Sequence, residues 1–112
     1  MIFETLKKSS DFKKFRTSSE RIESEYFKIL INGFYGCNDI IRFGYVISKK
    51  IGKSTVRNKL KRQVKEIFRN LEKKNTKSID ILFIAKKPMV NLDFYSLKDQ
   101  IYNNLQKYLR SN

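Results

Sequence analysis

Residues 42–69 read RFGYVISKKIGKSTVRNKLKRQVKEIFR, and within this stretch a strand pattern gives way to a helix pattern. A strand is predicted over residues 40–48 because apolar side chains alternate there. Its apolar face consists of Ile41, Phe43, Tyr45 and Ile47. Gly52 permits the turn that follows, and apolar residues then recur every three or four positions, as in a helix. The predicted buried stripe of that helix is Val56, Leu60, Val64, Ile67, Phe68 and Leu71.

The same stretch carries ten cations and a single carboxylate, Glu66. The cations are Arg42, Lys49, Lys50, Lys53, Arg57, Lys59, Lys61, Arg62, Lys65 and Arg69. At about 100° per residue, one arc of about 140° beside the apolar stripe holds Arg57, Asn58, Lys61, Arg62, Lys65 and Arg69. Glu66 can pair only with Arg62 or Asn70, four residues to either side, so most of the repulsion is uncompensated. The pattern predicts a surface that meets phosphates.

Composition supports one small domain spanning residues 1–112 with a nucleic acid as partner. The chain is 40% hydrophobic, enough for a modest core, and its formal net charge is +14, which a polyanion would neutralise. The sequence contains no stretch of about 18 apolar residues, which is the length needed to cross a membrane. The N-terminus lacks the apolar segment of a signal peptide. We therefore expect a cytoplasmic protein without membrane association. Cys37 is the only cysteine and histidine is absent, which excludes an internal disulfide and a Cys/His zinc site.

The rest of the chain predicts a small sheet and two further helices. The expected elements are a short helix over residues 9–16, a strand over 26–32, a loop over 33–39, a strand over 79–85, a connector over 88–91 and a final helix over about 94–108. Ser9 or Ser10 could cap the first helix, and Asn91 or Asp93 the last. In the strand over residues 26–32, Phe27, Ile29 and Ile31 are expected to face the core.

The stretch from Arg42 to Arg69 resembles the signature of the bacterial ribonuclease P protein subunit. The family pattern is an Arg-x-Gly strand, then Ser-Lys-Lys-x-Gly, then Arg-Asn-Arg-x-Lys-Arg, and an end of the type Arg/Lys-Glu-x-Phe-Arg. It is matched here by Arg42, Gly44, Ser48, Lys49, Lys50, Gly52, Arg57, Asn58, Lys61, Arg62, Lys65, Glu66, Phe68 and Arg69. Lys59 replaces the last arginine of the motif, which keeps the charge but loses the planar fork.

The resemblance implies an α+β fold, a single-domain α/β sandwich of the ribosomal protein S5 domain 2-like type. The implied element order is α-β-β-β-α-β-α, with a mixed sheet of about four strands. It also implies a left-handed βαβ crossover through the basic helix, whereas sequence pattern alone would favour the right-handed form.

The resemblance further implies that a large catalytic RNA cuts the substrate with bound magnesium, so no side chain of this chain is catalytic and none binds metal alone. The implied partners are this catalytic RNA and precursor tRNA, with no obligate protein partner. Residues implied to bind the catalytic RNA are Lys49, Lys50, Lys53, Arg57, Asn58, Lys59, Lys61, Arg62, Lys65 and Arg69. A cleft for the 5′ leader of precursor tRNA is implied at Phe12, Arg16, Lys28, Leu30, Gly44 and Val46. Because Arg16 and Leu30 stand where aromatic residues are common, less base stacking and more electrostatic binding are expected in this cleft.

Two other classes of function fit the sequence less well. A protein-only nuclease would need clustered carboxylates or a histidine base, but the aspartates are dispersed along the chain and histidine is absent. A ribosomal or general RNA-binding protein would explain the charge but not the long motif, and it would copurify with the ribosome rather than with one long structured RNA.

Overall fold

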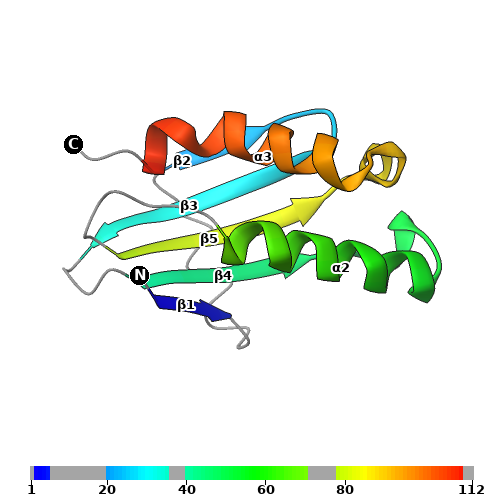
Figure 1. Cartoon of the computed structure of the whole chain (residues 1–112), viewed down its shortest axis with the longest axis horizontal. Coiled ribbons are helices and arrows are strands. Elements are labelled where there is room, and N and C mark those ends of the chain that lie inside the picture. Colours follow the sequence, from blue (N-terminus) through cyan, green and yellow to red (C-terminus); the bar gives the residue numbers. More distant parts are fainter. Residues whose placement is uncertain (1, 6–19, 36–39, 71–77, 110–112) are drawn as a thin grey trace.

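The computed structural model describes residues 2–5, 20–35, 40–70 and 78–109, which form one sheet with two α-helices against it (Figure 1). In chain order the elements are β1 (Ile2–Thr5), β2 (Glu20–Glu23), β3 (Phe27–Tyr35), β4 (Ile40–Val46), the 3-10 helix η2 (Lys49–Ile51), α2 (Ser54–Arg69), β5 (Ser78–Ala85), the 3-10 helix η3 (Lys87–Asn91) and α3 (Phe94–Leu109). The helix expected over residues 9–16 lies outside the described residues.

The sheet has the strand order β1-β4-β5-β3-β2. β4 runs parallel to β1 and β5, whereas β3 runs antiparallel to β5 and β2, so the sheet is mixed as predicted. The four strands β2 to β5 account for the expected sheet, with three of them before the basic helix. β1 adds an edge strand that the sequence did not predict, because four residues are too few to show a clear alternation.

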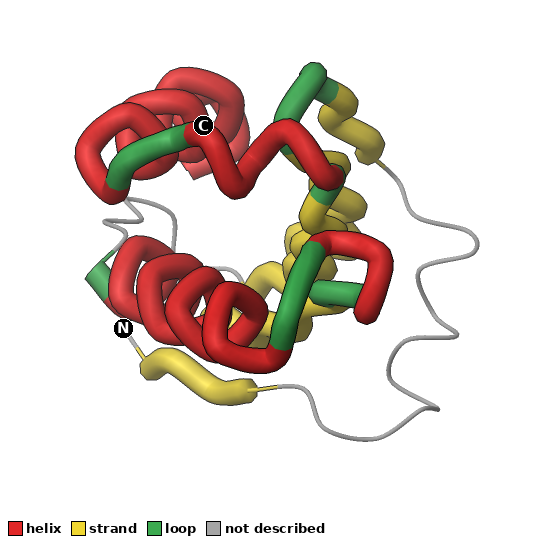
Figure 2. The backbone as a smooth tube through the Cα atoms, turned by 90° about the vertical axis from the view of Figure 1, so that its right-hand side faces the viewer, coloured by secondary structure: helices red, strands yellow, loops and turns green. Residues whose placement is uncertain are grey.

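The connection from β4 through α2 to β5 is left-handed, as the family resemblance implied. In Figure 1 both strands run to the right with α2 in front of them, and β5 lies above β4. A right-handed crossover would place β5 below β4. Figure 2 shows that α2 and α3 lie on the same side of the sheet.

The core lies between these two helices and one face of the sheet, which we call the helix face. Alternate strand residues point into it, and Phe27, Ile29 and Ile31 of β3 are fully buried as predicted. Phe68 of α2 stacks on Phe43 of β4, with ring centroids 4.3 Å apart. Val56 was predicted to join the buried stripe of α2 but is 37% exposed, because it lies in the first turn beside Gly52.

One loop prediction was partly wrong, and one cap prediction was confirmed. The loop was expected over residues 33–39, but β3 continues to Tyr35 with an irregular register between Gly33 and Tyr35, and residues 36–39 lie outside the described residues. Asp93 caps α3: its Oδ1 accepts a hydrogen bond from the backbone N–H of Ser96 at 2.7 Å. That hydrogen bond lowers the pKa of the Asp93 carboxyl below its ordinary value.

Candidate nucleic-acid interface

One side of α2 is cationic, and the opposite side packs into the core. Leu60, Val64, Ile67 and Phe68 form the buried stripe. The residues beside that stripe, which we call the basic flank, are Asn58, Lys61, Arg62, Lys65 and Arg69. Their spacing of three, four or seven positions brings them to one side of the helix, where they are exposed or half-buried. The helix therefore has a buried apolar side and an accessible polar side along its length.

Two other residues of the predicted set behave differently. The Arg57 Nε donates a hydrogen bond to the Gly52 carbonyl oxygen at 3.2 Å, which ties α2 to the turn before it. The backbone of Gly52 is extended. Its observed role in the turn is to accept this hydrogen bond through its carbonyl oxygen. Lys59 is exposed and lies at the edge of the basic flank, about 60° from Arg62 and about 100° from Asn58.

The basic surface continues beyond the N-terminus of α2. Lys49 and Lys50 lie on η2, and Lys53 occupies the N-cap position of α2; all three are exposed. Lys53 offers no side-chain cap, and the first turn of α2 has no acidic residue. Exposed cations thus continue along the chain from η2 through the N-cap into α2.

The described carboxylates leave this surface uncompensated. Glu66 accepts a hydrogen bond from the Asn70 amide at 2.9 Å, which realises one of its two expected pairings. Within the described ranges, the basic flank, η2 and Lys53 form no ion pair. Since no described carboxylate forms an ion pair with these cations, solvent ions or a bound polyanion would relieve the repulsion along the surface.

A groove runs between the basic flank and β4, and we call it the Tyr45 groove. Its lining consists of Tyr45, Thr55, Asn58, Lys61, Arg62 and Lys65. The Lys65 Nζ lies over the Tyr45 ring, 5.6 Å from its centroid. The sequence pattern placed Tyr45 only on the apolar face of its strand, because alternation reports the face of a residue but not the gap beside a neighbouring helix.

The second face of the sheet, away from α2 and α3, holds the other predicted residues that the structure describes. Strand register places Val46, Ile84 and Lys28 in one row across β4, β5 and β3. The next row consists of Gly44, Leu82 and Leu30. The structure therefore brings Lys28, Leu30, Gly44 and Val46 together, whereas Phe12 and Arg16 lie outside the described residues.

The rows also contain two residues that the sequence analysis missed. Leu82 and Ile84 of β5 lie between the predicted residues, and Leu30 packs with them in a small apolar cluster apart from the main core. Leu30 and Leu82 are buried, while Val46 is 41% exposed and Lys28 is half-buried. The central position of β5 could have identified them, since an interior strand contributes to both faces of a sheet.

A third row on the second face is an ion pair. Arg42 donates from Nε to Asp80 Oδ1 at 2.8 Å and from an Nη to Asp80 Oδ2 at 2.6 Å. The Asp80 side chain is 5% exposed and that of Arg42 is 27% exposed. Arg42 was counted among the ten cations of the basic stretch, but its charge is neutralised within the sheet.

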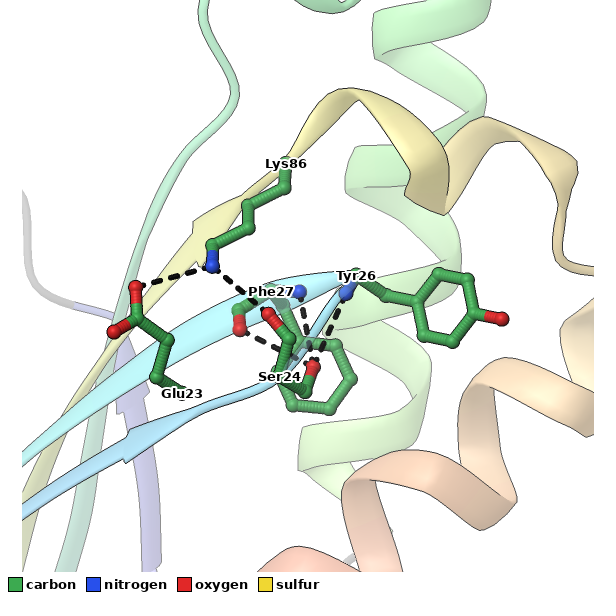
Figure 3. Close-up of polar contacts among 5 residues, drawn as sticks. All are labelled: Glu23, Ser24, Tyr26, Phe27 and Lys86. Carbon is green, nitrogen blue, oxygen red and sulfur yellow. Dashed lines mark hydrogen bonds and ion pairs between the residues drawn. The ribbon is translucent and has the colours of Figure 1, made fainter.

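Lys86 is likewise engaged within the protein (Figure 3). Its Nζ donates to the Ser24 carbonyl oxygen at 2.8 Å and to Glu23 Oε2 at 3.1 Å, joining the end of β5 to the turn between β2 and β3. In the same turn, the Ser24 Oγ accepts hydrogen bonds from the backbone N–H groups of Tyr26 and Phe27. The hydrogen bond and charge of Lys86 hold the pKa of Glu23 below its ordinary value, so this contact is lost as the pH falls and the carboxyl becomes protonated.

The described residues offer neither a metal site nor a membrane span. They contain no group of three or more His, Cys, Asp or Glu side chains placed to hold a metal ion. Among them no helix is long and apolar enough to cross a bilayer. The cations, the amide and the aromatic ring at these surfaces supply charge pairing, hydrogen bonding and stacking.

Comparison with known proteins relates the chain to one family. The family model for ribonuclease P matches residues 3–109. The ribonuclease P protein component of Caldanaerobacter subterraneus subsp. tengcongensis is 35% identical over 104 residues, covering 91% of this chain and 86% of that protein. The solved ribonuclease P protein of Thermotoga maritima is 34% identical with a TM-score of 0.77, covering 93% of this chain and 96% of that one. The match spans nearly the whole chain at substantial identity, so the chain belongs to the ribonuclease P protein family.

Proposed function

We propose that this chain, as the protein component of ribonuclease P, binds the catalytic RNA with the basic surface of η2 and α2. The observation that carries the proposal is the run of cations from Lys49 to Arg69, none of which forms an ion pair with a described carboxylate. Arginine and lysine in such an array contact phosphates, and the neighbouring Asn58 amide can donate to and accept from a sugar or base. The family match over residues 3–109 favours this function over the alternative of a ribosomal or general RNA-binding protein.

We also propose that the second face of the sheet binds the 5′ leader of precursor tRNA. The rows containing Lys28, Leu30 and Val46 combine a cation with apolar side chains, which suits a single strand with exposed bases and phosphates. With the leader on one face and the catalytic RNA on the flank of α2, the protein would hold the substrate against the RNA that cuts it. It would thereby assist removal of the leader to give the mature 5′ end.

Under this proposal the catalytic RNA carries the reaction. The carboxylates described here are too dispersed to hold magnesium, so the ions belong mainly to the RNA, and this chain supplies binding and orientation. The protein would act in the cytoplasm, and its assembly with RNA would need no other protein. Purified chain with magnesium alone should not cleave precursor tRNA.

A salt titration tests the contact with the catalytic RNA. Arg62→Ala and Arg57→Ala should each weaken binding and reduce the slope of log affinity against log salt by about 0.7 to 0.9, because each loses one phosphate contact. Lys98→Ala on α3 removes the same charge away from α2 and should leave the slope unchanged. Equal slopes for all three variants and the parent chain would overturn this assignment.

Leader length tests the second face. With bacterial catalytic RNA present, the binding advantage that the protein gives to precursor tRNA should grow over the first few leader nucleotides and then level off. Val46→Glu should reduce that advantage, since it places a negative charge beside the leader phosphates. Val90→Glu is the matched control, because Val90 of η3 is 38% exposed and Val46 is 41% exposed. An equal advantage for mature tRNA without a leader would rule out this face as the leader site.

A further inference from the structure

The Tyr45 groove has a chemical composition that phosphate binding alone does not require. Three cations, Lys61, Arg62 and Lys65, stand beside an aromatic ring, and Asn58 adds an amide that can both donate and accept. The three cations alone would suffice to bind phosphates. The ring and the amide instead match the flat surface and the polar edge of a nucleobase.

Tyr45 is held firmly while part of its surface stays accessible. Its ring contacts Phe43 with a centroid distance of 5.9 Å, and Phe43 in turn stacks on Phe68 in the core. Phe43 and Phe68 are both fully buried, whereas Tyr45 is only half-buried. Tyr45 therefore packs against the core with part of its ring and leaves the rest accessible at the groove.

The position of Tyr45 in the sheet explains why its ring remains accessible. In the described register, β1 pairs with β4 from Ile40 to Phe43, so Tyr45 lies two residues past the last pair. On its other side is α2, whose Lys65 extends over the ring with its Nζ 5.6 Å from the centroid. A base that stacks on Tyr45 would displace Lys65 from the ring face, and the released ammonium could then contact the phosphate of that nucleotide.

We propose that the Tyr45 groove binds one unpaired nucleotide of the catalytic RNA, with its base stacked on Tyr45 and its edge bonded to Asn58. Lys61 and Arg62 then contact the flanking phosphates. The nucleotide must be unpaired, because a base within a duplex cannot present its face to a side chain. This inference rests on the proposed function, since it gives the catalytic RNA a base contact within the basic surface.

Substitutions at Tyr45 separate stacking from charge. Tyr45→Leu keeps an apolar side chain but removes the ring, and it should weaken binding of the catalytic RNA by about 5- to 150-fold without changing the salt slope. Tyr45→Phe retains the ring and should stay within about twofold of the parent chain. Circular dichroism melting would show whether the leucine variant is folded at the assay temperature.

An amide pair on α2 gives a second test that does not touch the core. Chemical probing of the bound catalytic RNA should show one unpaired base protected by the parent chain and exposed with Asn58→Ala. Gln63→Ala removes an amide from the same helix outside the groove, and it should leave that base protected. Tyr45→Leu should expose the same base, and Tyr45→Phe should not.

These outcomes separate the nucleotide site at Tyr45 from the proposed binding of the catalytic RNA by α2. If Arg62→Ala weakens binding while Tyr45→Leu and Asn58→Ala change neither affinity nor protection, the groove holds no base and the nucleotide site is overturned. The basic surface would still bind the RNA in that case. If Arg62→Ala also has no effect, contact between α2 and the catalytic RNA is itself wrong, and the nucleotide site is overturned with it.

Discussion

Phe68→Ala is expected to lower the free energy of unfolding by about 3 to 5 kcal/mol, because it leaves a cavity at the centre of the core. Phe68 is fully buried, lies stacked on Phe43 and meets Phe83 edge-on with centroids 5.7 Å apart. Its loss would therefore weaken the contacts of α2 with both β4 and β5. Urea unfolding at fixed salt would measure the change.

Lys61→Ala is the matched control on the same helix. Lys61 lies on the basic flank and contributes nothing to the main core, so its removal should change the free energy of unfolding by no more than about 0.5 kcal/mol. The same variant should bind the catalytic RNA less tightly. If Lys61→Ala unfolded the protein and Phe68→Ala did not, the division of α2 into two sides would be wrong.

Asp80→Ala is expected to cost about 3 kcal/mol, since it removes one partner of a largely buried ion pair. The remaining Arg42 guanidinium would keep its charge without the carboxylate that accepts two of its hydrogen bonds. We place the cost at the lower end of the usual range because the Arg42 side chain is 27% exposed. Thermal and urea unfolding would both report it.

A double variant shows whether the cost comes from removing only one charge of the pair. Asp80→Leu combined with Arg42→Met replaces both partners with apolar side chains, and it should recover most of the stability lost in Asp80→Ala. Asp80→Ala should still bind the catalytic RNA at low temperature, because α2 is unchanged. A double variant no more stable than Asp80→Ala would show that the hydrogen bonds between Arg42 and Asp80 matter more than the loss of one charge of the pair.

Periodicity predicted the elements that bury one regular face. The alternation in β3 and the three-and-four spacing in α2 each report a direct physical requirement, that apolar side chains meet the core. The basic flank followed from the same helix geometry. Even the cap of α3 was among the two candidates that the sequence offered, because Asp93 lies directly before the first helical residue.

What the sequence could not provide depends on contacts between distant residues. Arg42 and Asp80 are 38 positions apart, so nothing local shows that this cation is neutralised. The groove beside Tyr45 depends on where α2 lies across β4. The hand of the crossover is a property of the whole unit, and general rules predict the opposite hand, so only the family resemblance gave it correctly.

The uncompensated cations of α2 give ionic strength opposite effects on folding and on binding. Added salt screens the mutual repulsion of the basic flank and should stabilise the free chain, while it competes with the protein for RNA phosphates and weakens the complex. Bound RNA removes the same repulsion and, by mass action, stabilises the native state further. Concentrated salt should thus stabilise the free chain during storage, whereas dilute salt should favour assembly of the chain with RNA. In the complex, the RNA phosphates stabilise the chain in place of the displaced salt ions.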